Sequence, residues 1–304
     1  MQAPDDFNPT AGVPEVLQPG VRRLLAPNPS PMTYRGTNTY LVGTTDLAVI
    51  DPGPDMDIHL EAILACVLPG QRISHIIVTH SHLDHSPLAR ALAARCAAPI
   101  YGFGPCEAGR STIMQDLVSA GMKSGGEGID LGFKPDITVA DGEILSAAGW
   151  KLEVIHTPGH LGNHIALALG DACFTADHVM GWASSLVSPP DGDLTDFMAS
   201  CARLRARDWR VFYPGHGAAV IAPQERLDWL ITHRKGREAE ILACLAEAPA
   251  TPAELARLIY KETPAALLPA AERNVFAHLV DLVGRSRVAP CGAFTGTGRF
   301  QILA

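Results

Sequence analysis

The sequence predicts an α/β protein built as a four-layer αββα sandwich, followed by a small winged-helix-like domain. Strands alternate with helices over residues 39–96, and strands dominate residues 137–177. Two halves of this character indicate two sheets packed face to face, with helices outside. After Pro223 the sequence pattern changes to that of amphipathic helices, followed by a pair of strands at the C-terminal end. We therefore expect one domain over residues 1–222 and a second over residues 223–304.

The first half begins with paired strands. Residues 39–42 and 47–50 are apolar runs on either side of a turn at 43–46, which is the pattern of a hairpin. Helical patterns at 58–68 and 87–96 flank a further strand at 76–79. The glycine-rich stretch 108–132 then interrupts the alternation. We interpret it as a loop or a loosely packed helix near the functional site.

The second half contains five short strands, which we expect at 137–139, 144–145, 152–155, 165–169 and 173–175. Beyond it, we expect three helices. The first covers residues 224–248, the second begins with Thr251 as its N-cap, and the third covers residues 269–284. Strands at 288–290 and 299–303 flank a turn rich in glycine and threonine. Three helices and a hairpin resemble a winged-helix unit.

One segment carries most of the chemistry. Directly after the apolar run 76–78, three imidazoles and one carboxylate occur within six positions: His80, His82, Asp84 and His85. In an extended backbone alternate side chains share a face, so His80 and His82 can face one ion. The turn into the next helix then directs Asp84 and His85 toward a second ion. The alternative is a histidine-rich surface loop.

Three more candidate ligands follow, each in a turn after a short apolar strand: His160, Asp177 and His216. In order and residue type, the whole set resembles the metallo-β-lactamase superfamily over roughly residues 20–220. The resemblance implies that His80, His82 and His160 bind one metal ion. It implies that Asp84, His85 and His216 bind a second ion and that Asp177 bridges the two. Asp51 stands where the family keeps an acid that hydrogen-bonds to a ligand and fixes its orientation.

Further segments resemble one subfamily of these proteins, the lactamase-beta-like group. They are residues 36–40, residues 213–217, the His233-Arg234 helix and the winged-helix-like tail. Some members of that group are endoribonucleases that act on single-stranded RNA. True metallo-β-lactamases do not place Asp at the bridging position, so Asp177 implies weak or absent β-lactamase activity.

A metal pair of this kind implies a hydrolase. Two divalent ions lower the pKa of a shared water toward neutrality, so that a bridging hydroxide is the expected nucleophile. Asp84 would receive or direct the proton as the intermediate collapses. Zinc is the expected metal because imidazole dominates the ligands, although a carboxylate bridge also accepts manganese or iron.

The remaining candidates are weaker. We expect His164 to be structural or to hold a ligand in place, and His178, next to Asp177, is a candidate general acid. The segment 233–237 is the densest basic patch and contains His233, Arg234, Lys235 and Arg237. It would face substrate or be a solvated helix face. Residues 203–304 contain 14 Lys and Arg against 10 Asp and Glu, so this part carries about +4.

Composition narrows the function. The net charge of -8 argues against nonspecific coating of nucleic acid, and the seven cysteines include no CxxC pair. No segment has the length and character of a signal peptide or a membrane span, so we expect a cytoplasmic enzyme. Its substrate would be RNA or a small thioester, lactone or other acyl compound. A third alternative is a non-enzymatic winged-helix protein that only binds DNA. Such a protein would have no use for the complete set of ligands.

Overall fold

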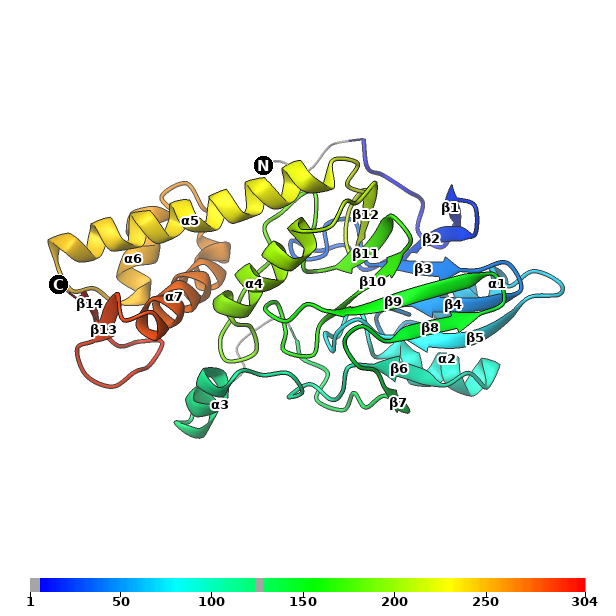
Figure 1. Cartoon of the computed structure of the whole chain (residues 1–304), viewed down its shortest axis with the longest axis horizontal. Helices are drawn as coiled ribbons and strands as arrows, with labels where there is room; N and C mark the ends of the chain where they lie inside the picture. The colour runs from blue at the N-terminus through cyan, green and yellow to red at the C-terminus, as the bar shows by residue number, and fades with distance from the viewer. Residues whose placement is uncertain (1–5, 124–127, 304) are drawn as a thin grey trace.

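The computed structural model describes residues 6–123 and 128–303. Two β-sheets lie face to face, with helices on their outer faces, and a helical unit extends from one end (Figure 1). The α/β sandwich expected from the sequence is confirmed, as is the small domain after it. No helix among the described residues combines the length and apolar character needed to cross a membrane.

The first sheet has seven strands, hydrogen-bonded in sequence order. They are β1 (Glu15–Gln18), β2 (Val21–Leu25), β3 (Asn38–Val42), β4 (Asp46–Ile50), β5 (Arg72–Ile77), β6 (Ile100–Gly102) and β7 (Ile137–Thr138). The expected hairpin is the antiparallel pair of β3 and β4. The strands β1, β2 and β6 were not predicted from the sequence, because they are short and lack a strong alternating pattern.

The second sheet has five strands, in the order β12-β11-β10-β9-β8. Their bounds are β8 (Ile144–Ala147), β9 (Trp150–His156), β10 (Ile165–Leu169), β11 (Ala172–Ala176) and β12 (Val211–Pro214). All neighbours are antiparallel except β11 and β12, which run parallel. The turns that follow β11 and β12 therefore meet at one edge of the sheet, and these turns carry Asp177 and His216.

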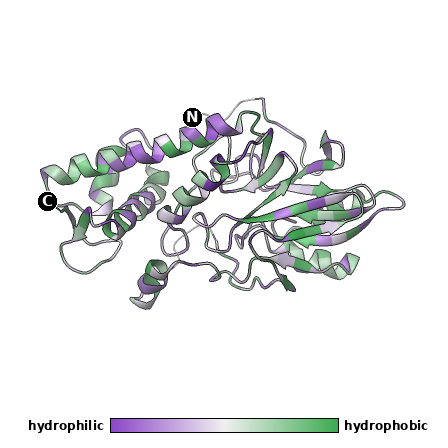
Figure 2. Ribbon diagram, in the orientation of Figure 1, coloured by the Kyte–Doolittle hydropathy of each residue, from purple (hydrophilic) through white to green (hydrophobic). Residues whose placement is uncertain are grey.

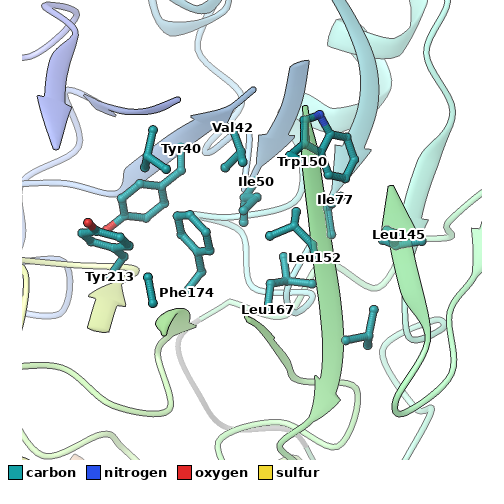
Figure 3. Close-up of a cluster of buried hydrophobic side chains, with 14 of the residues drawn as sticks. Tyr40, Val42, Ile50, Ile77, Leu145, Trp150, Leu152, Leu167, Phe174 and Tyr213 are labelled. Carbon is teal, nitrogen blue, oxygen red and sulfur yellow. The ribbon is translucent and has the colours of Figure 1, made fainter. Parts of the chain in front are cut away.

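Large apolar side chains from both sheets fill the space between them. Tyr40 and Ile50 of the first sheet meet Leu152, Leu167 and Phe174 of the second (Figure 3). The rings of Tyr40 and Phe174 contact edge to face, with 5.0 Å between their centroids. This packing holds the two sheets, and the loops at their edge, in a fixed relation.

Helices cover the outer faces. The first sheet is covered by α1 (Asp57–Ala65) and α2 (Leu88–Cys96), and the second by α4 (Leu194–Arg205) and the start of α5 (Pro223–Glu247). Many residues of the strands are hydrophobic (Figure 2), and their buried apolar side chains pack between these layers. We did not predict α4 from the sequence. Its signal was Asp193, whose side chain accepts a hydrogen bond from the backbone N–H of Thr195 and caps the helix.

The C-terminal unit consists of the end of α5, α6 (Pro252–Ile259), η1 (Ala265–Leu267), α7 (Leu268–Gly284) and the hairpin β13 (Val288–Pro290) with β14 (Phe300–Ile302). Thr251 caps α6 as expected, in a reciprocal pair with Glu254. Part of the glycine-rich stretch is the helix α3 (Thr112–Ser119), whose Met114 and Leu117 belong to the core of this unit. Residues 124–127 of that stretch lie outside the described residues.

The long helix α5 belongs to both cores. Leu227 and Leu230 pack with the second sheet and α4, whereas Ile241 and Leu245 pack with α6 and α7. Figure 1 shows this helix running from the sandwich to the far end of the molecule. The expected boundary between residues 222 and 223 coincides with the start of α5, which is also part of the sandwich core.

Candidate metal centre

The seven predicted ligands come from turns that follow four strands and meet at one edge of the sandwich. The turn after β5 supplies four of them, and the turns after β9, β11 and β12 supply His160, Asp177 and His216. All except Asp84 are buried. Turns at the ends of well-packed strands hold side chains precisely while leaving one side open to solvent.

The first group consists of His80, His82, His160 and Asp177, whose ligand atoms lie within 4.8 Å of one another. Nδ1 of His82 is 3.0 Å from Nε2 of His80 and also 3.0 Å from Nε2 of His160. A hydrogen bond between two ring nitrogens needs a proton on only one of them. The other nitrogen therefore directs a lone pair toward the point where the three rings meet. This arrangement fits a divalent cation with nitrogen ligands.

The second group consists of Asp84, His85, Asp177 and His216, again within 4.8 Å. Nε2 of His216 is 3.0 Å from a carboxylate oxygen of Asp84 and 3.3 Å from one of Asp177. Nε2 of His85 is 3.3 Å from the same nitrogen of His216. Two nitrogens and two carboxylates form a mixed donor set, which suits zinc, manganese or iron.

Asp177 is common to both groups. Its oxygens are 3.4 Å from Nε2 of His85 and 3.7 Å from Nε2 of His160, one on each side. The chain approaches closely here, because a Cβ atom added at Gly215 would lie 2.3 Å from a carboxylate oxygen of Asp177. Only glycine fits at that position. Ala176 has a φ of 42°, a left-handed conformation that is uncommon for non-glycine residues.

Backbone carbonyls orient two of the imidazoles. Nδ1 of His160 donates to the carbonyl of Leu186 at 2.8 Å, and Nδ1 of His216 donates to the carbonyl of Gly36 at 3.1 Å. A carbonyl oxygen only accepts, so each ring carries a proton on Nδ1. The opposite nitrogen, Nε2, faces the centre and is the atom that a cation would bind, displacing any proton held there.

Asp51 orients two further candidate ligands, His85 and His80. Its carboxylate accepts hydrogen bonds from Nδ1 of His85 at 2.9 Å and from the backbone N–H and hydroxyl of Thr79, each at 2.8 Å. The same hydroxyl accepts from Nδ1 of His80 at 3.0 Å. One buried carboxylate therefore fixes His85 directly and His80 through Thr79.

The electrostatics of the cluster also fit cations. Burial by itself lowers the pKa of His216, but the carboxylates of Asp177 and Asp84 raise it to about 10. Burial raises the pKa of Asp177, yet His216 and His85 hold it well below its usual range. Against the same effect of burial, His85 and His216 also hold the pKa of the partly exposed Asp84 well below its usual range, so the site keeps both carboxylates ionised. Cations that bind there would displace protons from the imidazoles.

His164 lies beside the centre. Its Nδ1 is 2.8 Å from the hydroxyl of Thr157, and its ring lies 5.1 Å from that of His80, centroid to centroid. It supports a predicted ligand from behind and belongs to neither group of possible ligands.

The structure brings neither the candidate general acid His178 nor the three predicted substrate contacts into the site. His178 is buried with Nε2 3.4 Å from the sulfur of Cys201, and His233 stacks on Trp229 with 4.9 Å between ring centroids. Arg234 is only 2% exposed, and it donates to the carbonyl of Ser185 and to Asn274. Arg237 pairs with Glu240 at 2.7 Å. The basic patch expected around Arg234 is therefore not a continuous surface, because its central charge is inside the protein.

A feature that the sequence did not reveal is the support of the 185–187 segment by the C-terminal helices. The backbone N–H of Val187 donates to the side chain of Asn274 in α7 at 3.3 Å, and Arg234 in α5 donates to the carbonyl of Ser185. Leu186, between them, holds His160. Because 87 residues separate Val187 from Asn274, no local pattern could have signalled this contact.

A cavity of about 300 Å³ opens above the centre. Its walls combine predicted ligands with apolar side chains, and the residues that line it are Ser30, Met32, Thr33, His82, Leu83, Asp84, His160, Asp177, Met180, Leu186 and His216. No lysine or arginine is among these described residues. The volume is at the lower end of the range for small-molecule sites.

The chain belongs to the metallo-β-lactamase superfamily, whose members are hydrolases. The model of that superfamily matches residues 32–216, and the model of the beta-lactamase associated winged helix domain matches residues 251–293. The fold, the order of the seven residues and the domain that follows therefore agree with the resemblance seen in the sequence.

Individual relatives extend along most of the chain. A beta-lactamase-like protein 2 homolog of Drosophila melanogaster is 29% identical over 286 residues, which are 90% of this chain and 91% of that protein. An atrochrysone carboxyl ACP thioesterase of Aspergillus fumigatus is also 29% identical, over 83% of this chain and 76% of that protein. A beta-lactamase domain protein from Burkholderia ambifaria has the same fold, with a TM-score of 0.80, 21% identity and coverage of 98% and 96%.

Proposed function

We propose that the protein is a dinuclear metal-dependent hydrolase of acyl thioesters. The observation that carries this proposal is the lining of the cavity above the ligand cluster. Met32, Leu83, Met180 and Leu186 surround the opening, and no cationic side chain is among the described residues there. Such walls suit a neutral, partly apolar substrate. A polyanion would need cationic contacts beside the reacting group.

The protein's own residues have distinct tasks in this proposal. His80, His82 and His160 would hold one ion and Asp84, His85 and His216 the other. Asp177 belongs to both groups and would be shared between the ions. Zinc is the preferred metal, with manganese or iron as alternatives. When bound, such a pair activates water at neutral pH and polarises the substrate carbonyl. Asp84, whose side chain is 22% exposed, is the carboxylate that can pass a proton between water and the leaving sulfur.

The thioester assignment also draws support from a relative. The protein of Aspergillus fumigatus that is 29% identical over most of its length is named as a thioesterase. Hydrolysis of a thioester consumes one water molecule. The water oxygen bonds to the acyl carbon, the C–S bond breaks, and the sulfur takes up a proton to leave as a thiol.

Cleavage of single-stranded RNA is the second candidate. The presence of a winged-helix domain favours it, since such domains often bind nucleic acid. The burial of Arg234 and the pairing of Arg237 with Glu240 count against it. Both residues would have to be accessible to guide a polyanion toward the cluster.

A hydrolysis panel separates the two candidates. The protein loaded with zinc or manganese is tested on acyl thioesters, lactones, a single-stranded RNA and a chromogenic cephalosporin, with His82→Ala as the control. We expect thioester hydrolysis that depends on His82, and weak or no turnover of the cephalosporin. His82-dependent cleavage of RNA without thioester hydrolysis would refute the proposal.

A further inference from the structure

A second cavity lies beside the one above the ligand cluster. The two share Met32, Met180 and Leu186 as common walls, and the second has a volume of about 260 Å³. Its lining residues are Pro31, Met32, Met180, Trp182, Ala183, Ser184, Leu186, Tyr260, Thr263, Leu267, Ala270, Ala271 and Asn274. We call this second cavity the side groove.

The side groove is apolar. None of the described residues that line it carries a charge, and its polar groups are a few neutral side chains. Two methionines stand at the junction with the first cavity, where unbranched, flexible side chains can adapt to ligands of different shape. Trp182 adds an aromatic wall, held by stacking on Tyr34 with 5.2 Å between ring centroids.

Both domains form the side groove. One wall is the 180–186 segment after β11, and the opposite wall comes from the C-terminal unit, through Tyr260, Leu267 and Ala270. Leu267 is 37% exposed although it is a large apolar residue. Because apolar surface is removed from water, the binding of an apolar ligand to such exposed walls lowers the free energy.

We propose that the side groove binds the acyl group of the substrate, so that the enzyme prefers thioesters of bulky apolar acids to those of short acids. This inference rests on the proposed thioesterase function. With the carbonyl at the ligand cluster, an acyl group that extends past Met180 and Leu186 enters the side groove. The thiol portion, which is more polar, then leaves through the open mouth near Leu83 and Asp84.

The C-terminal unit acquires a role in this arrangement. Its helices provide the far wall of the acyl site, so the winged-helix-like domain sets substrate size. Each methylene buried in the side groove should raise kcat/KM about 3- to 4-fold, the factor that corresponds to burial of one CH₂ group, until the groove is full.

The first test measures kcat/KM of the zinc-loaded protein on N-acetylcysteamine thioesters of acetic, butyric, hexanoic, octanoic and benzoic acid. We expect kcat/KM to rise from acetyl to hexanoyl by at least 30-fold. Equal values for acetyl and octanoyl would overturn the side-groove proposal and leave the thioesterase function intact. Failure to hydrolyse every member of the series would refute the thioesterase function itself.

The second test fills the side groove. Ala270 lies on its wall, so Ala270→Phe should lower kcat/KM for the octanoyl thioester at least 10-fold more than it lowers kcat/KM for the acetyl thioester. Ala266, four residues earlier, is exposed and is not part of the lining, which makes Ala266→Phe the matched control. An Ala270→Phe variant with an unchanged octanoyl rate would contradict the proposal.

A binding measurement removes the dependence on turnover. Calorimetric titration compares the thioethers S-ethyl-N-acetylcysteamine and S-octyl-N-acetylcysteamine, which cannot be hydrolysed, with and without zinc. The octyl compound should bind at least 10-fold more tightly to the parent and to Ala266→Phe, and lose that advantage in Ala270→Phe. Equal affinity of the parent for the two thioethers would overturn the proposal.

Discussion

Arg234 in α5 donates a hydrogen bond to the side-chain oxygen of Asn274 in α7, with 3.0 Å between the two atoms. The same oxygen accepts from the backbone N–H of Val187, and Arg234 also donates to the carbonyl of Ser185. The two C-terminal helices thus hold both ends of a three-residue segment. Leu186 in the middle of that segment fixes Nδ1 of His160.

This relationship predicts that Asn274 controls metal affinity at a distance. In Asn274→Ala, Val187 and the buried Arg234 each lose a partner, so the free energy of unfolding should fall by about 1–3 kcal/mol. The 185–187 segment would loosen, and His160 would be held less firmly. We expect about 10-fold weaker binding at the site of His80, His82 and His160, which titration with zinc or cobalt would measure.

The matched control is Glu272→Ala, on the same helix, because no described side-chain hydrogen bond or ion pair involves Glu272. It should bind metal as the parent does. A variant Asn274→Ala with two unchanged metal affinities would show that the 185–187 segment keeps its position without α7.

The contrast between His160 and Asn274 explains how much of the site could be predicted from the sequence. The seven candidate ligands stand in a recognisable order, each at the end of an apolar strand, so that spacing and residue type identify them. The fold followed in the same way from strands that alternate with helices. Asn274 and the burial of Arg234 depend on how distant helices pack, and a basic run on a helix does not reveal which of its charges points inward.

Metal content provides the second prediction. Because two groups of ligands share Asp177, the purified protein should hold close to two equivalents of transition metal, and Asp177→Ala should lose at least one. Asp171→Ala is the control, since that carboxylate pairs with Arg210 at the surface. Elemental analysis gives the ratio. A parent that binds one equivalent or less after incubation with excess zinc or manganese would rule out a dinuclear centre.

The third prediction concerns Asp196 and pH. Burial, and then the nearby Asp193, raise the pKa of Asp196 to about 6, above the ordinary value of 3.8. Between these pH values the folded state binds more protons than the unfolded state, so this group makes stability fall as pH rises from about 4 to 6. Asp196→Asn removes that dependence. Relative to the parent, the free energy of unfolding of this variant should increase by up to about 1 kcal/mol between pH 4 and pH 7. The effect is limited because Asp196 is only half-buried and solvent screens its charge.

Urea denaturation of the metal-free protein at several pH values measures this effect. Asp116→Asn serves as the control because Asp116 is exposed on α3. If the difference in stability between Asp196→Asn and the parent is the same at pH 4 and pH 7, the carboxyl group does not titrate in this range.

The last prediction concerns the connection between the domains. Helix α5 places Leu230 in the core of the sandwich and Leu245 in the core of the C-terminal unit, and both side chains are buried. Since one unbroken helix links the cores, we expect a single unfolding transition that both Leu230→Ala and Leu245→Ala shift. Each should lower the free energy of unfolding by about 2–5 kcal/mol, the usual effect of removing a buried leucine side chain. Leu258→Ala, at a position that is 54% exposed, should change little. Calorimetry that resolves two transitions, each sensitive to only one of the two buried leucines, would instead mean that the domains unfold independently.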